Sequence, residues 1–176
     1  MSLESIYERY SMPDKGGDKG TLHSYIPIYA THISPEVTSL LEIGVYEGHS
    51  LAMWQEYLPE ATVIGFDIDT SRVKFEVDAR EVDATNSLQL YNAIGDTLFE
   101  VIIDDGSHRV YDQMATFSLL FGNVEPGGLY IIEDVQGPDA LRVLTECVEK
   151  RTLNYKVFDL RGVKNRYDDI LIVIYK

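Results

Sequence analysis

Two short apolar runs that end in acidic residues constrain the fold of this chain most. One run, residues 101–103, continues into Asp104 and Asp105, and a second run continues into Glu133 and Asp134. Continuous apolar runs of this length are typical of parallel strands that are buried on both faces. Because the carboxyl ends of neighbouring parallel strands meet at one crevice, we expect these carboxylates to lie close together.

Crowded carboxylates repel one another unless a cation or a proton lies between them. His108 follows the first acidic pair in the segment Asp104-Asp-Gly-Ser-His108. The sequence therefore predicts a site for a hard divalent cation such as Mg²⁺ with a histidine beside it. For a lone Asp at a strand end, a cap of the following turn would be the better interpretation, but the convergence of four acids favours a functional site.

Composition narrows the class of protein. The chain has 176 residues, of which 45% are hydrophobic and 25% are charged, and this suits one globular domain with a substantial core. The formal net charge of -14 disfavours binding to nucleic-acid phosphates, and the single cysteine, Cys147, excludes an internal disulfide. No apolar segment resembles a signal peptide or approaches the length of a membrane span. We therefore expect a cytoplasmic protein with neither a nucleic-acid nor a membrane partner.

Apolar periodicity and turn residues divide the chain into alternating strands and helices. Strands are predicted at 37–43, 62–69, 80–83 (an edge strand), 99–104, 129–132, 155–158 and 169–175. Helices are predicted at 21–29 from Thr21, after Gly48, within 70–77, at 85–94 with Thr85 as cap, at 110–121 and at 141–148. The last two strands have no helical pattern between them and can pair antiparallel. The expected fold is α/β: a Rossmann-like, doubly wound, mostly parallel seven-stranded sheet with an antiparallel C-terminal strand.

The first predicted strand leads into a glycine turn, Gly44-Val-Tyr-Glu-Gly48, and then into a helix. This arrangement points the free N–H groups of a helix N-terminus at a ligand. Asp67 ends the second strand roughly 20 residues later, where an acidic side chain commonly holds a ribose diol. Tyr46 replaces the middle glycine of Gly-x-Gly-x-x-Gly, so a nicotinamide-dependent oxidoreductase is disfavoured.

Taken together, the strand order, the glycine turn, Pro126-Gly-Gly128 and the terminal hairpin resemble the class I S-adenosylmethionine-dependent methyltransferases over residues 37–176. Asp104–His108, Glu133-Asp134 and Asp18-Lys-Gly-Thr-Leu-His-Ser-Tyr25 resemble more narrowly the metal-dependent macrolide-sugar O-methyltransferases of the mycinamicin type and the cephalosporin-hydroxylase-like proteins. This resemblance implies a Mg²⁺-dependent O-methyltransferase that uses S-adenosylmethionine and acts on a hydroxyl of a sugar or another natural-product-like small molecule.

The resemblance also implies roles for individual residues. Asp105, Glu133 and Asp134 would bind the metal, and His108 would be the general base, with Asp105 as its catalytic partner. The leader, residues 1–36, would fold over the cofactor as a lid. The implied cofactor-binding residues are Lys19, His23, Tyr25, Glu42, Gly44, Val45, Tyr46, Gly48, Ser50, Asp67, Ile68, Asp83, Ala84 and Asp104.

Departures from the family pattern leave alternatives open. The family often has Asp-Gln-x-Asp after the third strand, whereas this chain has Asp83-Ala-Thr-Asn86, and no counterpart of the macrolide enzymes' further N-terminal domain is visible. Neither the acceptor nor the assembly is therefore implied, and a homo-oligomer is one alternative. A non-catalytic S-adenosylmethionine-binding module is the main rival function, although it gives no reason for the acids and for His108. The polar, glycine-rich segment 14–20 is expected to be flexible until a ligand binds.

Overall fold

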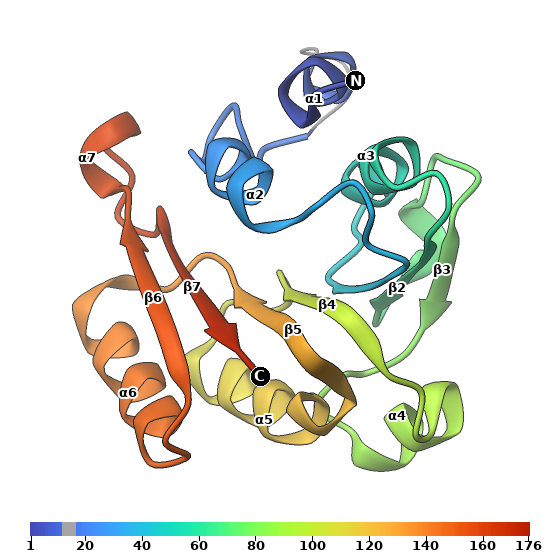
Figure 1. Ribbon diagram of the computed structural model, residues 1–176. Helices are drawn as coiled ribbons and strands as arrows, with labels where there is room; N and C mark the ends of the chain where they lie inside the picture. The colour runs from blue at the N-terminus through green and yellow to red at the C-terminus, as the bar shows by residue number, and fades with distance from the viewer. Residues whose placement is uncertain (12–16) are drawn as a thin grey trace.

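Figure 1 shows the computed structural model, which describes residues 1–11 and 17–176. Within these residues, seven strands form one sheet in the order β3-β2-β1-β4-β5-β7-β6. The strands are β1 (Ser39–Ile43), β2 (Thr62–Asp67), β3 (Asp78–Glu81), β4 (Phe99–Asp104), β5 (Val124–Ile132), β6 (Asn154–Asp159) and β7 (Ile170–Tyr175). β7 runs antiparallel to both β5 and β6, and the other pairs are parallel. The predicted α/β fold is confirmed.

Helices cover both faces of the sheet (Figure 1). One face carries α1 (Leu3–Tyr10), α2 (Ile26–His32) and α3 (His49–Tyr57), and the other carries α4 (Ser87–Ile94), α5 (Val110–Leu120) and α6 (Gly137–Glu149). Short 3₁₀ turns lie at Thr70–Arg72 and Phe121–Asn123. Across the described part of the chain, no helix has the length and apolar character needed to cross a membrane.

Alternation along the central strands creates two separate apolar cores. In β1, Leu40 faces the core under α1, α2 and α3, whereas Leu41 faces the core under α4, α5 and α6. In β4, Val101 and Ile102 divide in the same way. Because both faces are covered, the central strands read as continuous apolar runs rather than as alternating ones.

The helix predicted over residues 21–29 begins only at Ile26. Pro27 lies in its first turn, where the missing N–H of proline costs no helical hydrogen bond. The preceding residues form a turn instead, in which the carbonyl of Asp18 accepts hydrogen bonds from the backbone N–H groups of residues 21–23. Of the predicted flexible segment 14–20, residues 14–16 lie outside the described residues.

Two details of the helix predicted over residues 85–94 are wrong. Its cap is Asn86 rather than Thr85, because the Asn86 side chain accepts hydrogen bonds from two backbone N–H groups in the first turn. The apolar spacing predicts a face with Leu88, Tyr91 and Ile94, but the buried residues are Leu90 and Ile94, and Leu88 is 67% exposed. Packing against the sheet buries the side of the helix that carries Leu90, so the side that carries Leu88 remains exposed.

Smaller differences lie at the ends of other elements. β3 is an edge strand as predicted, but it begins at Asp78. β5 begins at Val124 and contains the predicted Pro-Gly-Gly turn, because the backbone there exchanges hydrogen bonds with Lys176. A short helix, α7 (Arg161–Lys164), lies between β6 and β7, where we expected no helix.

The hydroxyl of Tyr7 fixes α1 to the leader. It accepts hydrogen bonds from the N–H groups of Gly20 and Thr21, each at 2.8 Å, and donates one to the carbonyl of Gly17 at 3.0 Å. Tyr7 is buried. This one oxygen therefore organises three backbone groups of the segment that enters the candidate site.

We predict that Tyr7→Phe lowers the free energy of unfolding by about 1–3 kcal/mol, because two backbone N–H groups lose their acceptor. Urea denaturation measures the loss. Tyr10→Phe is the matched control, because the Tyr10 hydroxyl hydrogen-bonds, within the described part of the chain, to exposed Glu56 alone, at 3.0 Å, and its removal should cost about 0.5 kcal/mol or less. Equal losses in the two variants would contradict the role given to Tyr7.

Candidate functional site

The sheet order brings acidic residues from three strand ends to one place. β4 lies between β1 and β5, and the register pairs Ile43 with Asp104 and Asp104 with Ile132. Asp105 and Glu133, which follow these strands, therefore lie at the same edge of the sheet. Glu42, one residue before the end of β1, completes the group and is fully buried.

Lys19 lies among three of these carboxylates, which we name the inner cluster: Glu42, Asp105 and Glu133. Its Nζ is 2.7 Å from Asp105 Oδ2, 2.6 Å from Glu133 Oε1 and 3.1 Å from Glu42 Oε1. Burial alone would lower the pKa of Lys19, but the three carboxylates raise it well above its ordinary value. Lys19 is therefore a buried ammonium. The hydroxyl of Tyr29 also donates to Glu133.

Asp105, His108 and Asp134 form a second group, the outer cluster. His108 Nε2 is 3.2 Å from Asp105 Oδ1, and His108 Nδ1 is 3.6 Å from Asp134 Oδ2. Each has a ligand atom within 4.8 Å of the others. Asp105 is thus shared, with Oδ2 facing the inner cluster and Oδ1 facing the outer one.

The outer cluster shifts the pKa values of its members in different directions. Burial alone would lower the pKa of His108, but Asp105 and Asp134 raise it to about 9. Burial, with Asp105 nearby, raises the pKa of Asp134 to about 6. Burial would also raise the pKa of Asp105, but Lys19 and His108 lower it below its ordinary value. Asp134 is therefore harder to ionise than Asp105.

Two residues of the leader, His23 and Tyr25, contact Asp134. The hydroxyl of Tyr25 donates to Asp134 Oδ1 at 2.8 Å, and His23 Nδ1 lies 3.2 Å from the same oxygen. The rings of His23 and Tyr25 stack at a centroid distance of 4.9 Å. Both side chains are buried, so the structure places them against a carboxylate and not in a cavity.

The glycine turn depends on two close contacts. Gly44 has φ +89°, and a Cβ there would lie 1.9 Å from the backbone oxygen of Asp105. The N–H groups of Val45 and Tyr46 both donate to Asp67 Oδ2 at 2.8 Å. Asp67 therefore holds the turn in shape with one oxygen.

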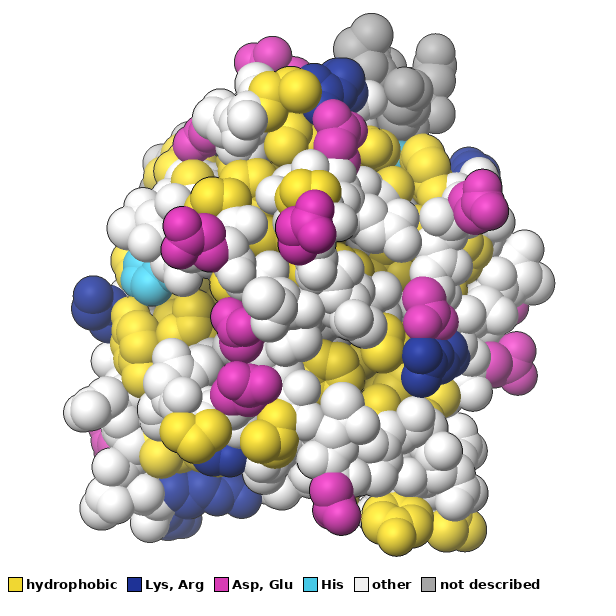
Figure 2. Space-filling model, turned by 45° about the vertical axis from the view of Figure 1, so that its right-hand side comes forward, with side chains coloured by type: hydrophobic (Ala, Val, Ile, Leu, Met, Phe, Trp, Pro, Cys, Tyr) yellow, Lys and Arg dark blue, Asp and Glu magenta, His cyan; other side chains and the backbone are white. Residues whose placement is uncertain are grey.

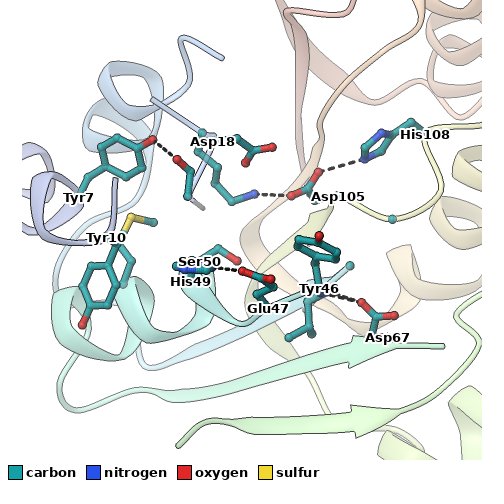
Figure 3. A pocket seen from close by; sticks show the side chains of 16 residues that line it. Tyr7, Tyr10, Asp18, Tyr46, Glu47, His49, Ser50, Asp67, Asp105 and His108 are labelled. Atoms are coloured by element: carbon teal, nitrogen blue, oxygen red, sulfur yellow. Dashed lines mark hydrogen bonds and ion pairs between the residues drawn. The ribbon is translucent and has the colours of Figure 1, made fainter. Parts of the chain in front are cut away.

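Two cavities meet at this turn. Figure 3 shows the first, of about 360 Å³, with Asp105 pointing toward His108 and with Tyr7 and Tyr10 of α1 opposite. The second, of about 490 Å³, lies between the ends of β2 and β4 and the start of α5. Gly44, Asp67 and Gly106 line both.

The predicted site residues divide between these cavities and the buried layer behind them. The first cavity is lined by Lys19, Gly44, Val45, Tyr46, Ser50, Asp67, Asp105 and His108. The second is lined by Gly44, Asp67, Ile68, Asp83, Ala84 and Asp104. His23, Tyr25, Glu42, Gly48, Glu133 and Asp134 line neither cavity and are buried.

Sequence reasoning missed two residues of this layer. Tyr29 lies one helical turn after Tyr25, so the shared face of a helix could have indicated it. Asp169 accepts hydrogen bonds from the N–H and the hydroxyl of Ser24, at 3.0 and 2.9 Å. It comes from the β6–β7 connection, and no local pattern links it to the leader.

The outer cluster fits a hard divalent cation. Two carboxylates on short loops offer oxygen ligands, and because burial raises the pKa of Asp134, a cation beside this carboxylate would stabilise its ionised form. The predicted ligand Glu133 instead contacts Lys19 and Tyr29. Its place among the metal ligands stays a prediction.

We predict that His108 titrates near pH 9 when divalent ions are removed with a chelator. Its stabilising contribution is fully present below its ordinary pKa of about 6.5 and is lost as the pH rises through about 9. NMR of the imidazole resonances measures this directly. Asp105→Asn should lower the His108 pKa, and titration of wild-type His108 at or below pH 6.5 would contradict the prediction.

Comparison with known proteins adds independent information. No protein-family model matches the chain. An 8-demethyl-8-alpha-L-rhamnosyl tetracenomycin-C 2'-O-methyltransferase of Streptomyces olivaceus is 38% identical over 136 residues, which cover 69% of this chain and 35% of that protein. The mycinamicin VI 2''-O-methyltransferase of Micromonospora griseorubida is 34% identical over 147 residues, which cover 76% of this chain and 36% of that protein. The chain thus spans about a third of the length of these curated relatives.

A solved structure agrees with these relatives. The MycE methyltransferase from the mycinamycin biosynthetic pathway, in complex with Mg and SAH, superposes with a TM-score of 0.72 and 26% identity. The match covers 99% of this chain and 55% of that chain. The leader is therefore included in the structural likeness, together with the sheet.

Proposed function

This chain belongs to the S-adenosylmethionine-dependent methyltransferases related to the macrolide and sugar O-methyltransferases, and we propose that it transfers a methyl group to a sugar hydroxyl of a small-molecule acceptor. The observation that carries the proposal is the meeting of two cavities at Gly44 and Gly106, with Asp105 and His108 lining the first cavity on either side of Gly106. A cofactor that spans both cavities and an acceptor that enters the first cavity would meet at these residues.

The cavities suit the two halves of S-adenosylmethionine. Phe66, Val82 and Ala84 give the second cavity an apolar wall for a flat purine ring. Asp67 lines both cavities. The one hydrogen bond that its Oδ1 accepts from a described residue comes from the N–H of Asp69, at 3.1 Å, so this oxygen can also accept from a ribose hydroxyl. The charged first cavity would receive the amino-acid end of the cofactor and the acceptor.

His108 is the residue best placed to remove the acceptor proton. A sugar hydroxyl is a weak nucleophile at neutral pH, and a positioned base typically contributes 10²- to 10⁴-fold to such a step. His108 lines the first cavity, and Asp105 orients its Nε2. With the pKa of His108 near 9, its ring is protonated in the ion-free protein and must lose that proton before it can act as a base.

A divalent cation fits this chemistry. Asp105 and Asp134 would hold it, and when bound it supplies Lewis-acid polarisation of the acceptor oxygen. The same two carboxylates are the groups that raise the pKa of His108. If an ion engaged these carboxylates, they would stabilise the imidazolium less, and His108 would be a better base at neutral pH.

Aromatic side chains at the first cavity favour a sugar as the acceptor. Tyr46 is 58% exposed, and Tyr7 and Tyr10 line the cavity from α1.

Figure 2 shows Lys and Arg on one face of the molecule only in separate small groups among scattered acids. With a net charge of -14, this surface suits a small molecule better than a nucleic acid.

We predict that His108→Gln and Asp105→Asn each lower the rate of methyl transfer by about 10²-fold or more, because the base or its orienting partner is lost. The assay measures S-adenosylhomocysteine formed with a panel of glycosylated acceptors, with and without Mg²⁺. Calorimetry should show that both variants still bind S-adenosylhomocysteine. Cofactor binding without transfer to any acceptor would favour the non-catalytic binding module, and wild-type rates in both variants would refute the assigned roles.

We predict that Gly44→Ala lowers the affinity for S-adenosylhomocysteine by about tenfold or more, because the new Cβ would overlap the Asp105 carbonyl and push the two sides of the cavity junction apart. Calorimetry measures the affinity. Gly122→Ala is the control, since a Cβ there meets no described atom within 4 Å. Unchanged affinity in Gly44→Ala would place the cofactor elsewhere.

A further inference from the structure

We propose that the Lys19 ammonium is a built-in cation that fills a latent divalent-cation site formed by Glu42, Asp105 and Glu133. The protein then has no room for an ion in the inner cluster, and removal of Lys19 opens that cluster to one. This inference concerns ion binding alone and is tested without methyl transfer.

The inner cluster has the geometry of an ion site. Each of its three members contributes an oxygen, and these oxygens lie within 4.8 Å of one another. Oxygens about 2.0–2.6 Å from a common Mg²⁺ or Ca²⁺ ion lie at such mutual distances. The Lys19 nitrogen is 2.6–3.1 Å from all three oxygens, so it lies where an ion would bind.

A second observation shows that the inner cluster is built around a positive charge. Glu42 is fully buried, and its Oε1 makes no hydrogen bond to any described residue although it lies 3.1 Å from Lys19 Nζ. This oxygen points at the centre of the cluster with its lone pairs unused. Desolvated carboxylates of this kind are strongly destabilising unless a cation lies beside them.

Lys19 itself has little capacity left for another ligand. An ammonium has three N–H donors, and Lys19 donates hydrogen bonds to Asp105 and Glu133 while Glu42 lies 3.1 Å away as an ion pair. The side chain is 4% exposed. We therefore assign its charge to the inner cluster and not to the carboxylate of the cofactor.

The decisive experiment counts Mn²⁺ ions. The protein is first treated with a chelator, and the chelator is then removed. Isothermal titration with Mn²⁺ should then give one more ion per chain for Lys19→Met than for the wild type. Lys19→Arg keeps a positive charge in the inner cluster and should keep the wild-type number. Adding Glu42→Gln to Lys19→Met should return the number to that of the wild type, because the third carboxylate is lost. An unchanged count in Lys19→Met, or an extra ion that survives Glu42→Gln, overturns the proposal.

Thermal unfolding provides a second readout. Lys19→Met should melt well below the wild type in the presence of a chelator, because three buried carboxylates lose their counter-charge. Excess Mn²⁺ should restore most of the loss in Lys19→Met, and it should shift Lys19→Arg no more than it shifts the wild type. A Lys19→Met chain that stays unfolded in Mn²⁺ refutes the proposal. Failure of methyl transfer in the wild type would instead refute the proposed function and leave the ion count intact.

Discussion

Repulsion among desolvated carboxylates is the constraint on which the rest of this structure depends. The parallel sheet forces Glu42, Asp105 and Glu133 to one edge, and the burial of Glu42 and Glu133 removes the water that would otherwise screen these carboxylates. Compensation comes from the leader, through the ammonium of Lys19 and the hydroxyl of Tyr29. The carboxylates of the sheet therefore need the leader for their counter-charge, and Lys19 of the leader needs these carboxylates for its own. The leader thus supplies residues of the site itself.

Contacts on both sides hold the leader in register with these acids. On the side of α1, Tyr7 organises the backbone around Gly20, where a Cβ would lie only 2.4 Å from the Tyr7 ring. On the side of α7, Lys164 donates to the carbonyls of Gly20 and His23. Since Lys19 and His23 reach different carboxylates, a small shift of this backbone would uncouple both clusters at once. The short helix α7, which the sequence pattern did not indicate, thus has a place in the site.

Local patterns predict the scaffold of this site but not its charge pairing. The apolar run of β4 and the rule that parallel strands end at one crevice were sufficient to bring Asp105 and Asp134 together. The cap and the buried face of α4 were wrong because Asn86 competes with Thr85 and because tertiary packing selects one of two apolar faces. Lys19 lies in a polar, glycine-rich stretch, and its partner Glu133 is 114 residues away. Spacing within the sequence carries no information on such a contact.

The two oxygens of Asp105 explain why similar carboxylates at one sheet edge differ in protonation. Lys19 contacts Oδ2 and His108 contacts Oδ1, so cations on both sides lower the pKa of Asp105 although it is buried. Asp104, one residue earlier, has no lysine beside it, and burial raises its pKa to about 7. Cations on both sides therefore keep Asp105 ionised at neutral pH, whereas burial raises the pKa of Glu133 well above its ordinary value although Lys19 lies beside it. Asp105 is thus already ionised where it faces the first cavity. If a cation were bound to Asp105, this carboxylate would stabilise protonated His108 less, and the pKa of His108 would fall.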